Sequence, residues 1–301
     1  LKSGDYTAQF QKWKDDFVLI HGQLDTQRQP EIEDIEKEFN LSLQKKDDIF
    51  YFLYCIETYY SIILRLLAFK KINGTILTLN LFSQIIDSSY FVGKGILNYS
   101  CEEYFNAPIL DEDFSKPIGS LVDRVNSIPF LNNDTDFIRQ IFEYLFPRQL
   151  RHSMGELYTP DLLAQFVIKQ VTDGDLLACN RHYIDPTCGS ATFLVNIAKY
   201  FISLNQNILD NIYGIDINPL SVLAAKTNYL LLCEDTFLKK RIPLLIPIFN
   251  ADIIQSPQLQ DMEQSLFDNF LHLTVGNNVV NMPLNSYSYH DYLLIAKSYF
   301  M

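Results

Sequence analysis

In the second half of the chain, short apolar runs alternate with longer helix-like runs, and this pattern constrains the fold more than any other sequence feature. Strands are predicted at residues 181–185, 212–216, 243–249 and 271–275, and helices at 160–171, 191–204 and 219–232. Strands that alternate with helices of about 10–15 residues are typical of a parallel α/β sheet. We therefore expect a doubly wound parallel sheet in this half.

The first half lacks that pattern, because glycine is sparse up to residue 150 and apolar residues recur at helical spacing. Amphipathic helices are predicted at 31–43, 75–93 and 134–147, the last with Asn133 or Thr135 as its N-cap. We expect a helical N-terminal domain over 1–148 and an α/β domain over 149–301. The chain begins without Met and ends within an apolar stretch, so we expect a fragment whose second domain is incomplete.

Residues 49–69 form an apolar run about as long as a membrane-spanning helix. Glu57 and Arg65 lie inside it, and each would cost about 2.5–3.5 kcal/mol near the centre of a bilayer. Acidic residues precede the run and lysines follow it, which matches the dipole of a helix. We therefore expect a buried helix of the helical domain, with a membrane span as the alternative.

The charge balance bears on nucleic-acid binding. The chain has 36 acidic and 24 basic side chains and a net charge of −12, and acidic residues outnumber basic ones in both halves. Neither half has the positive surface of a segment that binds DNA by itself. Phosphate contacts would have to come from local patches or from another region of the protein.

The five cysteines are scattered without a CxxC pair, and no secretory signal is visible. This usage indicates reduced thiols in a cytoplasmic protein. His and Cys never cluster at the spacing of a zinc site, so we expect no metal.

Three acids follow successive predicted strands. Asp185 precedes a turn of small residues, Pro186 to Ser190, that leads into a helix; alone, this is equally typical of a structural turn. Ligands of open α/β sheets bind at the carboxyl ends of strands, near free amides of the next helix. Asp216 would suit ribose hydroxyls and Asp252 an exocyclic amino group, although each alone could be a helix-start or loop acid. Together they favour a nucleoside site.

These motifs resemble the N6-adenine DNA methyltransferases in which the cofactor motif precedes the catalytic motif. Residues 155–160 (GELYTP) resemble the leading motif of that family, 185–194 its cofactor loop, 213–219 its ribose motif, and Ala251-Asp252 its adenine-binding position. The four matches cover about residues 150–277 and imply a Rossmann-like methyltransferase sheet. More loosely, the first half resembles the helical domain that precedes this module in large restriction–modification enzymes.

The resemblance implies S-adenosylmethionine as cofactor and a role for each matched position. Thr159 and Pro160 would line its methionine end. Asp185 and the Gly189 backbone would surround its amino acid, with Thr187 as a further cofactor-binding residue. Asp216 would hold the ribose hydroxyls, Ile217 would pack on the adenine, and Asp252 would bind its amino group. The family usually has Gly where this chain has Ala191.

The residues at the catalytic motif differ more strongly from the family pattern. The family has Asn or Asp, two prolines and an aromatic residue, which hold and stack on a flipped adenine. Here Asn277 matches, but Asn278, Val279 and Val280 replace the prolines and the aromatic residue, and the following Asn281 to Leu284 is expected to be a loop. Base–aromatic stacking contributes about 1–3 kcal/mol. Three explanations stand: an inactive homologue, an altered motif, or a stretch of chain missing after Gly276 or Asn277, which we favour.

We therefore expect a DNA adenine-N6 methyltransferase module of a restriction–modification or related defence system, with Asn277 as its catalytic residue. Duplex DNA would be bound through a target-recognition domain absent from this chain, with a partner subunit as a further possibility. The alternative is a catalytically inactive, cofactor-binding or structural module of a defence complex. An RNA or protein methyltransferase on the same fold is a third interpretation.

Overall fold

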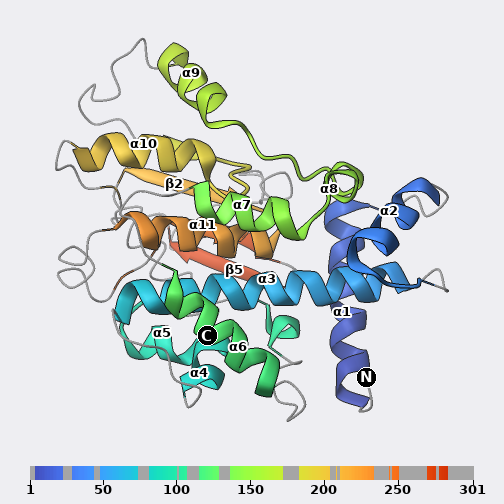
Figure 1. The fold of residues 1–301 in the computed structure, drawn as a ribbon. Helices are drawn as coiled ribbons and strands as arrows, with labels where there is room; N and C mark the ends of the chain where they lie inside the picture. Colours follow the sequence, from blue (N-terminus) through green and yellow to red (C-terminus); the bar gives the residue numbers. More distant parts are fainter. Residues whose placement is uncertain are drawn as a thin grey trace.

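The computed structural model describes residues 4–22, 29–43, 48–73, 81–99, 102–106, 115–128, 136–171, 183–203, 208, 211–233, 244, 246–250, 270–275 and 278–283. Among these residues, all the elements of secondary structure that precede Tyr183 are helices (Figure 1). These helices are α1 (Gly4–His21), α2 (Gln29–Phe39), α3 (Asp48–Asn73), α4 (Phe82–Ile86), α5 (Ser89–Gly93), the 3₁₀ helix η2 (Glu103–Phe105), α6 (Ser115–Ser127), α7 (Asp136–Leu145), α8 (Arg148–Met154) and α9 (Asp161–Val171).

Helix α3 contains the apolar run at 49–69, for which a membrane span is the alternative interpretation. Among the described residues it is the one helix long and apolar enough to cross a membrane, yet 83% of its most apolar window is buried within the protein. It runs across the molecule beside α11 (Pro219–Leu232), as Figure 1 shows, and contacts α1, α6 and α7 as well. The burial supports the interpretation of α3 as a core helix.

The buried side chains form one large continuous cluster. It includes Trp13 of α1, Leu64 of α3 and Phe146 after α7, and it continues into Leu223 of α11 and Ile248 of the sheet. An isolated parallel bridge between Ile96 and Leu244 also joins the two halves of the sequence. The helical region and the sheet are therefore packed against each other through a shared core.

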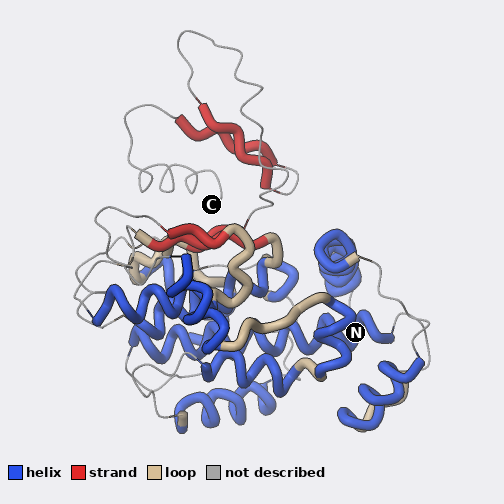
Figure 2. Tube along the Cα trace, turned by 90° about the horizontal axis from the view of Figure 1, so that it is seen from above, coloured by secondary structure: helices blue, strands red, loops and turns tan. Residues whose placement is uncertain are grey.

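The parallel sheet has three strands in the order β1 (Tyr183–Asp185), β2 (Ile212–Asp216) and β3 (Ile248–Asn250). Helices α10 (Thr192–Ser203) and α11 form the crossovers and contact each other. Figure 2 shows helices gathered on one side of this sheet. The expectation of parallel strands joined by helices is met, with the predicted bounds 212–216 and 219–232 reproduced.

Gly214 lies where the first crossover packs closely on the middle strand. A Cβ at this position would lie 2.7 Å from Ile248 Cδ1, 2.7 Å from Leu194 Cδ1 and 3.0 Å from Cys188 Sγ. A side chain at this position would therefore force the Ile248 and Leu194 side chains to shift within a close-packed core. The absence of a side chain at Gly214 thus lets β3, α10 and the turn after β1 meet over β2.

Predictions for two regions of the chain, residues 75–93 and 271–283, are wrong. The described residues of the predicted helix 75–93 form two short helices, α4 and α5, because Ser88 between them adopts a left-handed conformation with φ of 66°. The predicted strand 271–275 does not join the parallel sheet. It is β4 (Phe270–Val275), and it pairs antiparallel with β5 (Asn278–Pro283), which Figure 2 shows apart from the parallel sheet.

The residues around the catalytic motif explain this hairpin. Residues 276–277 separate the two strands, and a two-residue connection favours antiparallel pairing. Val279 and Val280 pair with Thr274 and Leu273. β-Branched residues favour strands, whereas prolines at such positions would remove backbone donors. Asn281 to Pro283, expected in a loop, therefore continue β5 instead.

Candidate functional site

The turn after β1 is compact and lies directly against β2. The Asp185 side chain accepts a hydrogen bond from the Thr187 amide at 3.1 Å, and the Cys188 amide donates to the Ile215 carbonyl at 2.9 Å. Gly189 has a φ of 52°, and Ala191 has a φ of 73° although it carries a side chain. The left-handed conformation explains why glycine is favoured at position 191, because a Cβ there costs about 1–2 kcal/mol.

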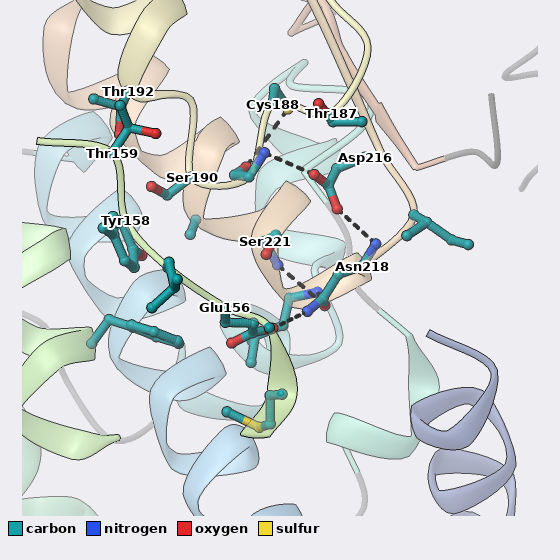
Figure 3. A pocket seen from close by; sticks show the side chains of 18 of the residues that line it. Glu156, Tyr158, Thr159, Thr187, Cys188, Ser190, Thr192, Asp216, Asn218 and Ser221 are labelled. Atoms are coloured by element: carbon teal, nitrogen blue, oxygen red, sulfur yellow. Dashed lines mark hydrogen bonds between the residues drawn. The ribbon is translucent and has the colours of Figure 1, made fainter. Parts of the chain in front are cut away.

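Asp216 joins this turn to the start of α11. Its Oδ2 accepts from the Gly189 amide at 2.7 Å, and its Oδ1 accepts from the Asn218 amide at 2.9 Å (Figure 3). The Asn218 side chain then caps α11 by accepting from the amides of Leu220 and Ser221. Asn218 is therefore the N-cap of α11, and Pro219 lies in its first turn. One carboxylate thus fixes two strand-end turns relative to each other.

Glu156 reaches the same turn from the segment after α8. Helix α8 ends at Gly155 with a φ of 73°, a common helix C-terminal conformation. The Glu156 Oε1 accepts from Asn218 Nδ2 at 2.5 Å. It also lies 3.6 Å from Nε2 of His21, whose Nδ1 donates to the Met154 carbonyl at 3.0 Å. The end of α1, the segment after α8 and the β2–α11 turn therefore meet at one carboxyl group.

A cavity of about 440 Å³ lies over these turns. This volume falls within the usual range of cofactor and small-molecule sites, about 300–1,000 Å³. The cavity is lined by α1, α3, α7, the 154–159 segment, the end of β1 with the turn after it, α10, the end of β2 with the turn after it, and α11. The lining residues are Ile20, His21, Tyr60, Phe142, Met154, Gly155, Glu156, Leu157, Tyr158, Thr159, Asp185, Thr187, Cys188, Gly189, Ser190, Thr192, Phe193, Asp216, Ile217, Asn218, Leu220, Ser221 and Ala224. We call it the strand-end cavity.

The ionisable groups of the strand-end cavity are acidic, apart from His21. Glu156, Asp185 and Asp216 line it, and its described lining contains no Lys or Arg. Burial raises the pKa of Glu156 to about 7, with a further increase from the charge of Asp216 and an opposing effect of the Asn218 hydrogen bond. Burial, and to a smaller extent Asp216, also raises the pKa of Asp185. The cavity therefore suits a ligand that carries positive charge and hydrogen-bond donors.

Two further groups at this cavity are shifted towards their uncharged forms. Burial lowers the pKa of His21, against the hydrogen bond to Met154 and the charge of Asp216. Burial raises the pKa of Cys188, and the charges of Asp216 and Asp185 raise it further. Cys188 is therefore a packed thiol and not an activated nucleophile. Among the described residues, no group of three or more His, Cys, Asp or Glu side chains could hold a metal ion.

The structure brings together six of the nine predicted site residues. Thr159, Asp185, Thr187, Gly189, Asp216 and Ile217 all line the strand-end cavity. Pro160 does not line it; its carbonyl instead accepts from the amides of Leu163 and Ala164 at the start of α9. Asp252 and Asn277 lie outside the described residues, so their roles stay predictions.

Sequence reasoning missed two residues of this site. Glu156 stands within the GELYTP motif, which gave it no role, and His21 lies in a helix that carries no motif. The motif could have pointed to Glu156. Nothing local could have pointed to His21, because the residues that its ring contacts here, Met154 and Glu156, lie more than a hundred positions away in the sequence.

Comparison with known proteins gives two matches. Residues 133–278 match the family model described as N-6 DNA methylase. The match includes Asn277 and ends where the sequence departs from the expected catalytic motif. No curated protein matches the chain.

Among solved structures, the chain is similar to a candidate class I S-adenosylmethionine-dependent methyltransferase from Listeria monocytogenes. The two share 17% identity with a TM-score of 0.28 over 64% of this chain and 53% of the other, so the chain spans about half the length of that protein.

Proposed function

We propose that the chain is the methyltransferase module of a restriction–modification or related defence protein that methylates adenine N6 in DNA, because residues 133–278 match the N-6 DNA methylase family. S-Adenosylmethionine is the methyl donor. The observation that carries the assignment of its site is the Asp216 carboxylate at the end of β2, held by the amides of Gly189 and Asn218 at the mouth of the strand-end cavity.

The residues present fit this cofactor. A sulfonium and an ammonium group need anionic surroundings, and three carboxyl groups line the cavity without a Lys or Arg among its described lining residues. A Cβ at Gly189 would meet nothing within 4 Å, so the turn there leaves open space for a ligand against the backbone. When bound, the cofactor supplies an electrophilic methyl group.

Each residue has a defined role in this proposal. Asp216 accepts hydrogen bonds from the ribose hydroxyls with the lone pairs that the two amides leave free. Ile217, which is 39% exposed and lines the cavity, packs on the adenine ring. Asn277 accepts a hydrogen bond from the N6 amino group of a flipped target base. The bound cofactor would supply its methyl group to this nitrogen, and Asn277 would hold the amino group in position for the transfer.

The partners follow from the charge of the chain. With a net charge of −12, the chain lacks the positive surface needed to hold duplex DNA by itself. We infer that a target-recognition domain or partner subunit supplies this positive surface.

The three described cysteines, Cys55, Cys188 and Cys233, are free, which agrees with a cytoplasmic protein.

Calorimetric titration of the chain with S-adenosylmethionine tests the proposal. We expect binding in the micromolar range for the original chain and a loss of at least tenfold for Asp216→Ala. Asp123→Ala is the matched control, because it removes an exposed acid of α6 that does not line the cavity. No binding by the original chain, or equal binding by Asp216→Ala, would overturn the assignment of the cavity.

A second candidate function is a cofactor-binding module without catalysis, favoured by Asn278, Val279 and Val280 in β5. Two assays of the chain bound to its DNA-recognition partner separate the candidates. Transfer of labelled methyl groups to adenine by the original sequence supports the enzyme. Transfer only after Asn278→Pro, Val279→Pro and Val280→Tyr together supports the inactive module.

A further inference from the structure

Three acidic groups come close together on the side of the strand-end cavity nearest the helical region. The charge of Asp216 in β2 raises the pKa of Glu156, and the charge of Glu156 raises the pKa of Glu57 in α3. His21 of α1 faces Glu156 from a fourth element. The tyrosines Tyr60 and Tyr158 are also close enough for Glu156 to raise their pKa values, after the larger effect of burial. Glu156 lies 3.6 Å from His21 of the helical region and accepts a hydrogen bond from Asn218 of the β2–α11 turn.

The contacts of Glu156 are specific. Its Oε1 receives the hydrogen bond from Asn218 Nδ2 at 2.5 Å, and the backbone amide of the same Asn218 donates to Asp216. Asn218 is buried and its side-chain oxygen is used to cap α11. The orientation of the Asn218 side chain is therefore set from both ends, by Glu156 at the amide nitrogen and by α11 at the oxygen.

The contact with His21 requires a proton between the two groups. His21 Nδ1 must be protonated to donate to the Met154 carbonyl. A neutral His21 then presents a bare Nε2 to Glu156 Oε1 at 3.6 Å. Two lone pairs facing each other are unfavourable, so this contact is favourable while His21 or Glu156 carries an added proton.

We propose that Glu156 is a positioning residue of the strand-end cavity, which orients Asn218 and the Asp216 turn for the cofactor and, through His21, makes helix α1 a component of the cofactor site. This inference rests on the proposed binding of S-adenosylmethionine. It assigns to the helical region a direct role in binding, beyond that of a packed neighbour.

A pH dependence follows from the same geometry. Burial and Asp216 raise the pKa of Glu156 to about 7 in the free protein. A cationic ligand favours the ionised carboxyl group and lowers this pKa, so binding releases a proton. Affinity should therefore weaken as the pH falls below about 7, by at most tenfold per pH unit for one proton. Burial shifts His21 and Glu57 as well, so substitutions at Glu156 are needed to assign the proton.

The test compares two substitutions by calorimetry with S-adenosylmethionine between pH 6 and 8.5, in two buffers with different ionisation enthalpies. Glu156→Gln retains an oxygen that accepts from Asn218, whereas Glu156→Ala does not. We expect Glu156→Ala to weaken binding at least tenfold at pH 8. We expect Glu156→Gln to weaken it less than Glu156→Ala does, with the pH dependence and the proton release lost. Melting curves without ligand check that both variants fold.

His21 is tested in the same assay. Asparagine in His21→Asn has a side-chain amide that can donate to the Met154 carbonyl, whereas alanine in His21→Ala has no such donor. We expect His21→Ala to weaken binding about threefold in the original chain and to have no further effect in Glu156→Ala, because the two residues act through one contact. Additive effects would overturn the portion of the inference that concerns α1.

The outcomes separate this inference from the proposed function. If the original chain does not bind S-adenosylmethionine, the proposed function fails. If it binds and Glu156→Ala binds equally well, only the positioning role fails. Equal losses for Glu156→Ala and Glu156→Gln at every pH would also overturn it, because the hydrogen bond to Asn218 would then not matter.

Discussion

The helical region and the strand-end turns each contain a carboxyl group inside the protein, and they accommodate it differently. Glu57 in the middle of α3 is 7% exposed and receives one hydrogen bond, from Trp13 Nε1 at 2.8 Å. Asp216 at the end of β2 receives two, both from backbone amides. Amides within a helix are already bonded, whereas turns and helix starts leave amides free. At a strand end, free backbone amides can therefore stabilise a carboxylate that faces a ligand, whereas within a helix the donors must come from other side chains.

The pKa of Glu57 follows from this difference. Burial raises it to about 8, with a further increase from Glu156 and an opposing effect of the Trp13 hydrogen bond. Glu57 is therefore mainly protonated at neutral pH. Its role is one of packing within α3, although it lies only a few residues from the cavity-lining Tyr60.

Asp216→Asn tests how the strand end holds its carboxylate, and we expect it to have a large effect on stability. An asparagine has one oxygen to accept hydrogen bonds, so one of the amides of Gly189 and Asn218 would face an NH₂ group instead. An unsatisfied buried donor costs about 1–3 kcal/mol, so we expect the free energy of unfolding to fall by about 2 kcal/mol in urea denaturation at pH 7. An unchanged value would mean that the two amides do not depend on this carboxylate.

A second prediction concerns Glu57→Gln. Because the pKa of Glu57 is raised from 4.5 in the unfolded chain to about 8 in the folded protein, the folded state binds more protons between these values. The contribution of Glu57 to stability is therefore greatest below about pH 4.5 and is lost as the pH rises towards 8. Glutamine keeps an acceptor for Trp13 and does not titrate.

Melting temperatures of the original chain and Glu57→Gln should therefore be similar near pH 5 and diverge above it. At pH 8.5 we expect the variant to be the more stable chain, because glutamine has no carboxyl group to ionise inside the protein. Glu103→Gln, at an exposed acid of η2, is the control and should show no such divergence. A constant difference between the two chains at all pH values would contradict the raised pKa.

The smallest effect is expected for Ala191→Gly in the turn after β1. Glycine relieves the strain of a φ of 73°, about 1–2 kcal/mol. The gain is offset by the lost burial of the Ala191 methyl group, about 0.8 kcal/mol, and by the greater freedom of the unfolded chain. We expect the midpoint of urea denaturation to change by the equivalent of less than about 1 kcal/mol. Gly189→Ala introduces a side chain at a φ of 52°, and the added methyl group would meet nothing within 4 Å. This substitution should therefore destabilise the chain.

Much of the site could be predicted because its residues belong to local motifs. Asp185, Gly189 and Asp216 each follow a strand within a few positions, and parallel strands bring their carboxyl ends to one edge. The hairpin of β4 and β5 was not predicted, because the fourth run was assigned to the parallel sheet from its position in the series. Which strand a short apolar run pairs with depends on its neighbours in space, and here the two-residue connection favours β5.

The sequence by itself determined the parallel unit of β1, β2 and β3 with its crossover helices, the cap of α11 by Asn218, and the acids at the strand ends, because these depend on residues a few positions apart. Only the tertiary structure decided that α3 is a core helix in contact with α11, that one core connects the helices to the sheet, and that His21 meets Glu156. These contacts join residues far apart in the chain. Their partners are selected by packing and by the need of buried polar groups for hydrogen bonds, which no local pattern records.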